Sequence, residues 1–218
     1  MIRAVCFDLD GTLFDRDVAV RSLGETQYVA FARELTGVSP ESFVSRLLEL
    51  DAHGSVDKEI VYKRLMLEFE LPEALGPRLV EDFWGRYHHF CRPFPDAFNT
   101  LEALRARGKT VGLITNGRRV IQSGTIDALR VRPFFDAILI SEVEGVRKPE
   151  RAMFERAAAR LGVAPQECCH VGDHPEVDVA GAMAAGMTAV WKRVPYWPEP
   201  SKAVPTIDTL GEVLEHAP

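Results

Sequence analysis

The sequence predicts an α/β fold, a doubly wound parallel sheet with a helical segment inserted after its first strand. Three observations support this prediction. Short apolar runs recur along the chain, helical patterns separate the later runs, and the gap between the first two runs is far longer than a single crossover needs.

Five short runs rich in apolar and β-branched residues are each expected to form a strand. Such runs are typical of parallel strands that are buried on both faces of a sheet. The five predicted strands are Ile2–Phe7, Lys109–Ile114, Ala137–Ile140, Cys168–Val171 and Met187–Trp191.

Helical periodicity appears between the later strands. Phe98, Leu101 and Leu104 repeat at the spacing of one helix face, and Gly108 follows as a suitable residue for a helix end. The segment 154–161 repeats the same pattern and is also followed by a glycine. Strands that alternate with helices of this length predict a sheet with helices on both faces.

The first two strands are separated by an insertion. The chain from Asp8 to Thr115 is about 75 residues longer than a βαβ unit, which needs roughly 30. The extra residues carry several apolar stripes of helical spacing, so we expect a helical cap over residues 16–92 and a core formed by 1–15 and 93–218. Ligands of open α/β sheets bind beyond the carboxyl ends of the strands. An insertion rooted there is therefore expected to act as a lid.

Composition narrows the class of function. The 218 residues carry a formal net charge of −6 and show no Lys/Arg cluster, so we expect no nucleic-acid partner. No apolar stretch reaches the length of a membrane span, and no secretory signal opens the sequence, so we expect no membrane partner and a cytoplasmic location. Cys6, Cys91, Cys168 and Cys169 fit small packing residues better than a metal or redox site. The oligomeric state stays open.

The most informative motif follows the first strand. It reads Asp8-Leu9-Asp10-Gly11-Thr12, and a match to D-x-D-G-T arises by chance about once in five hundred chains of this length. Asp and Gly also form turns, which is the alternative reading of these residues. Their position at the carboxyl end of an apolar strand favours a functional reading.

Two further features suit a phosphate group. The second strand ends in Ile114-Thr115-Asn116-Gly117, where a hydroxyl and successive backbone N–H groups could hold phosphate oxygens. Asn-Gly is also a common turn, so this signal is weak alone. Lys148 precedes Pro149 at the start of the next predicted helix. A cation at a helix start opposes the helix dipole and lowers stability, so a functional reason for this lysine is favoured.

The fourth strand is followed by two acids. Asp173 comes directly after Val171-Gly172, and Asp178 follows five residues later. Magnesium prefers carboxylate, carbonyl and water oxygens. The pair therefore predicts a site for a hard divalent cation, Mg²⁺.

Together these four motifs resemble the phosphatase-type members of the haloacid dehalogenase superfamily. All four occur in the order of that family, and the resemblance covers essentially the whole chain. It implies a Rossmann-like core with strand order 5-4-1-2-3. It also implies that the helical insertion is the type 1 cap of that family.

The resemblance also implies roles for the matching residues. Asp8 would attack phosphorus and form an aspartyl-phosphate, and Asp10 would protonate the leaving oxygen and later activate water. Lys148 would neutralise charge. The phosphoryl oxygens would be held by Thr115, Asn116 and Gly117. Mg²⁺ would be held by the Asp8 carboxylate, the Asp10 carbonyl and Asp173, with Asp178 binding it directly or through water.

These roles lead us to expect a hydrolase acting on phosphomonoesters of small metabolites. The dehalogenase branch of the superfamily lacks an acid at the position of Asp10, so the phosphatase branch is favoured. A sugar phosphomutase shares the same motifs and stays open, and a non-catalytic sensor of phosphorylated metabolites is a further alternative. The sequence of the cap does not reveal the substrate.

Overall fold

The fold was analysed in a computed structural model, which describes residues 1–217. The chain forms two compact units. One consists of Met1–Asp15 and the chain from Pro93 onward, and we call it the sheet unit. The other, Arg16–Arg92, we call the helical unit.

The sheet unit contains one sheet in which all neighbouring strands are parallel, in the order β3-β2-β1-β4-β5-β6. The predicted order 5-4-1-2-3 is confirmed, with β6 added beside β5 at the edge. The sequence did not predict β6 because it has only two residues, too few for a periodic pattern. The strands are β1 (Ala4–Phe7), β2 (Thr110–Thr115), β3 (Ala137–Ile140), β4 (Cys168–Gly172), β5 (Thr188–Lys192) and β6 (Thr206–Ile207).

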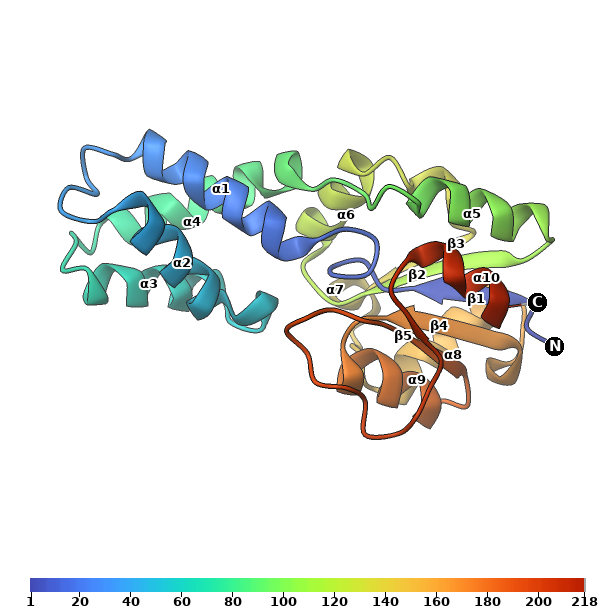
Figure 1. The fold of residues 1–218 in the computed structure, drawn as a ribbon. Helices are drawn as coiled ribbons and strands as arrows, with labels where there is room; N and C mark the ends of the chain where they lie inside the picture. Colours follow the sequence, from blue (N-terminus) through green and yellow to red (C-terminus); the bar gives the residue numbers. More distant parts are fainter. Residues whose placement is uncertain (218) are drawn as a thin grey trace. The chain divides into compact units, whose positions relative to one another are not determined.

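Helices cover both faces of this sheet, as a doubly wound fold requires. α5 and α10 lie on one face, and α8 and α9 lie on the other (Figure 1). The helices of the sheet unit are α5 (Ala97–Ala106), α6 (Arg119–Ala128), α7 (Ser141–Glu144), α8 (Arg151–Arg160), α9 (Gly181–Ala184) and α10 (Val213–His216). Short helical turns are η3 (Arg132–Phe134), η4 (Pro165–Glu167), η5 (Pro175–Ala180) and η6 (Leu210–Glu212).

The core of the sheet unit explains why β1 is apolar throughout. All four residues of β1 are fully buried, and Ala4 and Cys6 pack in one hydrophobic cluster with Phe154 of α8 and Ala182 of α9. Burying a large apolar side chain stabilises a fold by about 2 kcal/mol. Within residues 1–217, all four cysteines are buried and none forms a disulfide.

The helical unit consists of four helices with two short turns. The apolar stripe of Phe43, Leu47 and Leu50 lies on α2, and that of Val61, Leu65 and Phe69 runs one residue past the end of α3. The elements are α1 (Arg16–Ala30), α2 (Pro40–Asp51), η1 (Ala52–Gly54), α3 (Lys58–Glu68), α4 (Leu75–Arg86) and η2 (Tyr87–Phe90).

A buried charge cluster joins three parts of the helical unit. Asp51, at the end of α2, pairs with Arg16 at the start of α1 and with Lys58 at the start of α3. It also accepts a hydrogen bond from the N–H of Gly54 at 2.9 Å. Burial favours the neutral form of Asp51, but its two cationic neighbours outweigh burial and lower its pKa. The carboxylate therefore ties these helix ends together.

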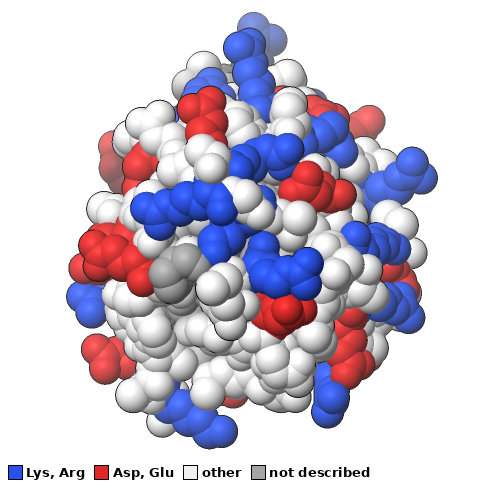
Figure 2. Space-filling model, turned by 90° about the vertical axis from the view of Figure 1, so that its right-hand side faces the viewer, with Lys and Arg blue, Asp and Glu red and all other residues white. Residues whose placement is uncertain are grey.

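Charges of both signs alternate on the surface near the two chain ends. Figure 2 shows Lys and Arg side chains beside Asp and Glu side chains on that face. Ion pairs of the sheet unit include Arg3–Glu167 at 3.3 Å and Arg105–Asp136 at 2.9 Å. Exposed pairs of this kind contribute about 0–1 kcal/mol each, so they affect solubility more than stability. Within residues 1–217, no helix is both long and apolar enough to span a bilayer.

Candidate active site

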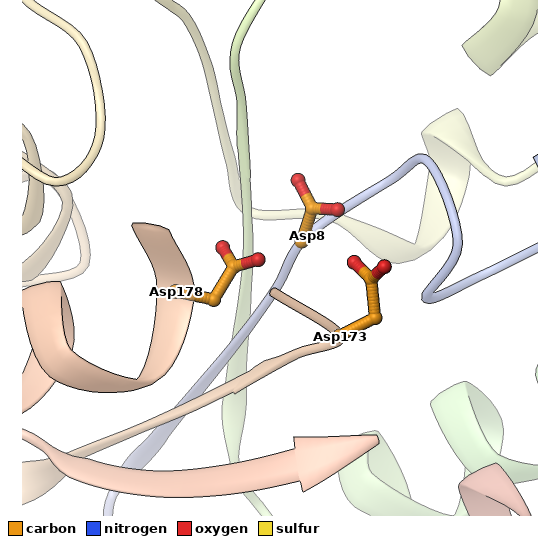
Figure 3. A group of neighbouring side chains, drawn as sticks. All are labelled: Asp8, Asp173 and Asp178. Carbon is orange, nitrogen blue, oxygen red and sulfur yellow. The ribbon is translucent and has the colours of Figure 1, made fainter. Parts of the chain in front are cut away.

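Three carboxylates from two strand ends and one turn meet at the carboxyl edge of the sheet. Asp8 follows β1, Asp173 follows β4, and Asp178 lies in η5 (Figure 3). Each offers an oxygen within 4.8 Å of oxygens of the other two, and all three residues are buried. Adjacent parallel strands end at the same edge, which explains how positions 165 residues apart converge.

The ammonium group of Lys148 lies between two of these carboxylates. Its Nζ is 2.5 Å from Oδ1 of Asp8 and 2.6 Å from Oδ1 of Asp178, and the side chain is 2% exposed. Burial favours a neutral amine, but the two carboxylates outweigh it and raise the pKa of Lys148. Lys148 is therefore a cation held against the predicted nucleophile.

The side chain of Asn116 fixes the backbone of Lys148. The Lys148 N–H donates to Oδ1 of Asn116 at 2.9 Å, and Nδ2 of Asn116 donates to the Lys148 carbonyl, also at 2.9 Å. This reciprocal pair joins the loop after β2 to the loop that carries the lysine. Asn116 thus acts on the position of Lys148 through its side chain, in addition to the phosphate contact predicted for its N–H group.

Two histidines hold Asp178 in place. His170, inside β4, lies with Nε2 3.0 Å from Oδ1 of Asp178. Nδ1 of His174 accepts hydrogen bonds from the N–H groups of Glu176 and Val177 at 3.2 Å and caps the turn that presents Asp178. Burial lowers the pKa values of both histidines, which favours their neutral forms.

The carboxylates differ in their tendency to ionise. Burial raises the pKa of Asp8 to about 7, although Lys148 opposes this shift. Burial and the neighbouring Asp8 raise the pKa of Asp173 well above its ordinary value. Burial would also raise the pKa of Asp178, but Lys148 and His170 outweigh it and hold that pKa well below its usual range. Asp178 is therefore the ionised partner of Lys148.

Asp173 is fixed from three sides. Thr12 Oγ1 lies 3.4 Å from its Oδ1, and Nε1 of Trp197 donates to its Oδ2 at 3.1 Å. Nε1 of Trp191 donates to its backbone carbonyl at 2.6 Å. The indole of Trp197 also packs on the ring of His174, with ring centroids 4.4 Å apart. The loop after β5 thus orients the acid at the end of β4.

Two glycines are needed for the carboxylates to approach. A Cβ on Gly11, whose φ is +83°, would lie 2.5 Å from Oδ2 of Asp173. A Cβ on Gly172 would lie 2.4 Å from the Cγ of Asp178. Both distances are well below van der Waals contact, so any side chain at these positions would displace an acid. The glycines of the first and fourth motifs therefore make room for the site.

The remaining predicted residues lie around the same edge. Thr115 ends β2 and is fully buried. Its hydroxyl accepts a hydrogen bond from Nε2 of Gln122 at 2.5 Å, and the same nitrogen donates to Oδ2 of Asp10 at 2.7 Å. The N–H of Gly117 donates to Oγ of Ser141 at 2.9 Å, so Ser141 already occupies that donor in this structure.

The structure corrects one local detail of the sequence analysis. Pro149 was expected at the first position of a helix beginning near Glu150. The helix α8 begins at Arg151, with Glu150 as its N-cap, so Pro149 precedes the helix. The peptide bond between Lys148 and Pro149 is cis. Lys148 lies in the loop before α8, with its Nζ 2.5 Å from Oδ1 of Asp8.

The donor set fits a divalent cation. Asp8, Asp173 and Asp178 can carry three negative charges, and Lys148 supplies one positive charge close to them. One divalent cation would balance the two that remain. The oxygens are carboxylates, which Mg²⁺ prefers over softer metals. Burial is the main cause of the raised pKa values of Asp8 and Asp173, and the neighbouring acids raise both further, so a bound cation would favour their ionised forms.

Sequence reasoning missed three contributors to this site. His170 lies inside an apolar strand, Gln122 lies on a helix, and Trp197 lies in a proline-rich loop. Nothing in the spacing of these residues distinguishes them from packing or surface positions. Their partners are 8, 112 and 24 positions away along the chain, so only the fold reveals the contacts.

Comparison with known proteins identifies the family of this chain. The family model of haloacid dehalogenase-like hydrolases matches residues 2–186. A glyceraldehyde 3-phosphate phosphatase of Methanopyrus kandleri is 34% identical over 206 residues, which cover 87% of this chain and 83% of that protein. A ribulose-1,5-bisphosphate 5-phosphatase of Halopiger xanaduensis is 32% identical, with coverage of 87% and 84%.

A solved structure shares the whole architecture. The crystal structure of a haloacid dehalogenase-type phosphatase from Thermococcus onnurineus superposes with a TM-score of 0.71 at 30% sequence identity, covering 99% of this chain and 97% of that chain. This chain belongs to the haloacid dehalogenase-like hydrolase family. The prediction of a phosphatase-type enzyme of that family is confirmed.

Proposed function

We propose that this protein is a Mg²⁺-dependent phosphatase that releases phosphate from a small phosphorylated sugar through an aspartyl-phosphate on Asp8. One observation carries the proposal. The carboxylate of Asp8 lies at the edge of the sheet, 2.5 Å from the ammonium of Lys148 and beside two further acids that suit a divalent cation. The relatives that act on glyceraldehyde 3-phosphate and ribulose 1,5-bisphosphate support a phosphosugar as the class of substrate.

In the first half-reaction, an oxygen of Asp8 forms a bond to phosphorus while the ester P–O bond breaks. The leaving alkoxide takes a proton from the carboxyl group of Asp10. In the second half-reaction, water attacks phosphorus and gives a proton to Asp10, and the bond between phosphorus and Asp8 breaks. Asp8 returns to a carboxylate and Asp10 to an acid, so the proton balance closes.

Charge determines whether Asp8 can approach its target. A carboxylate about 4 Å from a phosphate dianion meets a repulsion of roughly 8 kcal/mol at an effective dielectric near 20. Lys148 opposes part of this repulsion from its position between Asp8 and Asp178. When bound by Asp8, Asp173, the Asp10 carbonyl and, directly or through water, Asp178, Mg²⁺ would supply the remaining positive charge. Thr115 and the N–H group of Asn116 are proposed to hold phosphoryl oxygens. The N–H group of Gly117 would join them by exchanging its hydrogen bond to Oγ of Ser141 for one to the phosphate.

We further propose that the helical unit, residues 16–92, acts as a cap that selects the substrate. It is inserted directly after the loop that carries Asp8 and Asp10, and the chain returns to the sheet unit at Pro93. Its helices contribute none of the four predicted motifs. A separate unit connected at this point can vary without changing the residues proposed to carry the chemistry.

Phosphate release tests the proposal. The wild-type protein is incubated with glyceraldehyde 3-phosphate, ribulose 1,5-bisphosphate and other sugar phosphates, with Mg²⁺ and after removal of metal by a chelator. We expect metal-dependent release from at least one of them and a loss of more than about 10³-fold in Asp8→Asn. Asp127→Asn, in which an exposed acid of α6 is changed, serves as the matched control and retains activity. Full activity in Asp8→Asn would exclude Asp8 as the nucleophile.

A further inference from the structure

A buried glutamine of α6 contacts the residue proposed as the general acid. Gln122 is 4% exposed, and its Nε2 lies within hydrogen-bonding distance of three oxygens. These are Oδ2 of Asp10 at 2.7 Å, Oγ1 of Thr115 at 2.5 Å and the backbone carbonyl of Asn116 at 3.3 Å. Since Gln122 is remote in sequence from the first motif, neither the sequence motifs nor the roles they imply include it.

The partners fix the orientation of the amide. The Asn116 carbonyl can only accept a hydrogen bond, and Oδ2 of Asp10 also accepts, both in the carboxylate and in the acid whose proton is on Oδ1. The NH₂ end of Gln122 must therefore face them, which settles the choice between its oxygen and its nitrogen. An NH₂ group has two hydrogens, and the two shortest contacts lead to Asp10 and Thr115. One neutral donor thus binds the proposed acid and the proposed phosphate-binding hydroxyl together.

We infer that Gln122 is a positioning residue that holds the carboxyl group of Asp10 in the orientation from which it protonates the leaving oxygen. This inference rests on the proposed function. Asp10 lies in the loop after β1 and is only partly buried, unlike Asp8. A side chain in such a loop samples several rotamers unless a partner holds it. Gln122 supplies such a partner from a helix, which is a rigid element.

The shared donor also aligns two parts of the reaction. Thr115 is proposed to bind a phosphoryl oxygen, while Asp10 is proposed to meet the oxygen that leaves. Because both are bonded to the same nitrogen, the acid and the phosphate-binding hydroxyl keep a fixed separation. Displacement of a catalytic group by about 1 Å can cost on the order of 10²-fold in rate.

Two substrates with different leaving groups distinguish a role in positioning the acid from a merely structural role, because only the first changes their relative kcat/KM values. The alkoxide of a sugar phosphate needs a proton as it departs, whereas p-nitrophenolate is stable as an anion and departs without one. The value of kcat/KM reports only steps up to the first irreversible one, here the transfer of the phosphoryl group to Asp8. Loss of the positioned acid therefore lowers kcat/KM for the sugar phosphate selectively.

The experiment compares glyceraldehyde 3-phosphate with p-nitrophenyl phosphate in the full-length protein with Mg²⁺. Gln122→Met keeps the length of the side chain and removes the donor. We expect kcat/KM to fall about 30-fold for the sugar phosphate, part of the 10²–10⁴-fold that a general acid contributes, and by no more than about threefold for p-nitrophenyl phosphate. Gln166→Met, at an exposed glutamine of η4, is the matched control and changes neither value.

Two further variants secure the interpretation. Gln122→Glu keeps the shape of the side chain and places a second carboxyl group beside Asp10. It is expected to show the same selective loss of kcat/KM for the sugar phosphate. If Gln122→Met does not fold, Gln122→Glu serves as the test. Asp10→Asn is expected to be selective in the same sense. Adding Gln122→Met to Asp10→Asn should cause less than about a threefold further loss, because the two residues act as one unit.

The outcomes separate the inference from the proposed function. Equal losses for the two substrates in a folded variant, a change in KM alone, or wild-type activity would overturn the role of Gln122 and leave the phosphatase proposal intact. Additive losses in the double variant would also overturn it. If the wild-type protein released no phosphate from any sugar phosphate in the presence of Mg²⁺, both the inference and the proposed function would be wrong.

Discussion

Replacing Lys148 with methionine tests how charge is balanced in the site. Methionine retains most of the side-chain volume and removes the ammonium that lies 2.5 Å from Asp8 and 2.6 Å from Asp178. The loss of one partner from a buried ion pair costs about 3–5 kcal/mol, because the remaining charge stays desolvated. Lys148 also lowers the pKa of Asp8, so its removal should raise that pKa further above 7.

The pH dependence gives the sign of the effect. In the wild-type protein without metal, Asp8 is largely protonated below pH 7 and ionised above it. A pKa raised in the folded state means that stability falls as the pH rises from the unfolded value of 3.8 toward 7. At pH 5.5, Lys148→Met therefore loses chiefly the pair with Asp178. At pH 8 the variant also loses the pairing of ionised Asp8, which must then take up a proton or stay charged without its partner, so the destabilisation should be larger.

Urea unfolding and steady-state kinetics measure the two consequences. We expect the free energy of unfolding without metal to fall by about 3–5 kcal/mol at pH 8 and by less at pH 5.5. A comparable loss of transition-state stabilisation corresponds to a decrease of about 10³-fold in kcat/KM. Lys63→Met, at an exposed lysine of α3, is the matched control.

A double-mutant cycle separates charge from packing. If the pair of Lys148 with Asp178 is the main electrostatic contact at pH 5.5, Asp178→Asn and Lys148→Met should be strongly non-additive at that pH. A variant Lys148→Met that unfolds like the wild type at both pH values and retains kcat/KM within tenfold would refute this account of the charge balance.

Three further predictions concern metal binding and the helical unit. Mg²⁺ should raise the melting temperature more at pH 8 than at pH 6, because at pH 6 binding must displace a proton from Asp8. Thermal unfolding with and without Mg²⁺ measures this difference, and a larger shift at pH 6 would contradict the prediction. Trp197→Phe, which removes the donor to Asp173, should weaken Mg²⁺ binding about 10-fold or more in a calorimetric titration, whereas unchanged affinity would exclude this orienting role. Asp51→Asn should destabilise the protein by about 3–5 kcal/mol in urea unfolding, because Arg16 and Lys58 lose their shared carboxylate, and an unchanged midpoint would show that the cluster contributes little.

The sequence predicts the sheet well because its strands are buried on both faces. Continuous apolar runs such as Ala137–Ile140 have few alternative structures, and that run coincides with β3. The acids at the strand ends were predicted for the same reason, since parallel strands bring their carboxyl ends to one edge. The order of the strands therefore brings Asp8 and Asp173 together, and the turn η5 adds Asp178.

The contacts that orient these acids were not predictable from pattern. Gln122 lies four positions into the helix α6, where a glutamine is as common on the surface as in a site. His174 follows Asp173 in the sequence, and only the structure shows that its ring caps η5. The side chain of Asn116 binds the backbone of Lys148, a contact that depends on how two loops meet. Each depends on tertiary distances that no local spacing encodes.

A covalent phosphoryl group on Asp8 is the most direct test of the proposed mechanism. The protein is mixed with Mg²⁺ and glyceraldehyde 3-phosphate, quenched in acid during turnover, digested and analysed by mass spectrometry, with Asp8→Asn as the control. We predict a phosphoryl group on the peptide that contains Asp8 in the wild type and none in the variant. Turnover of the wild type with every peptide unmodified, or with the group on another residue, would contradict the assignment of Asp8 as the nucleophile.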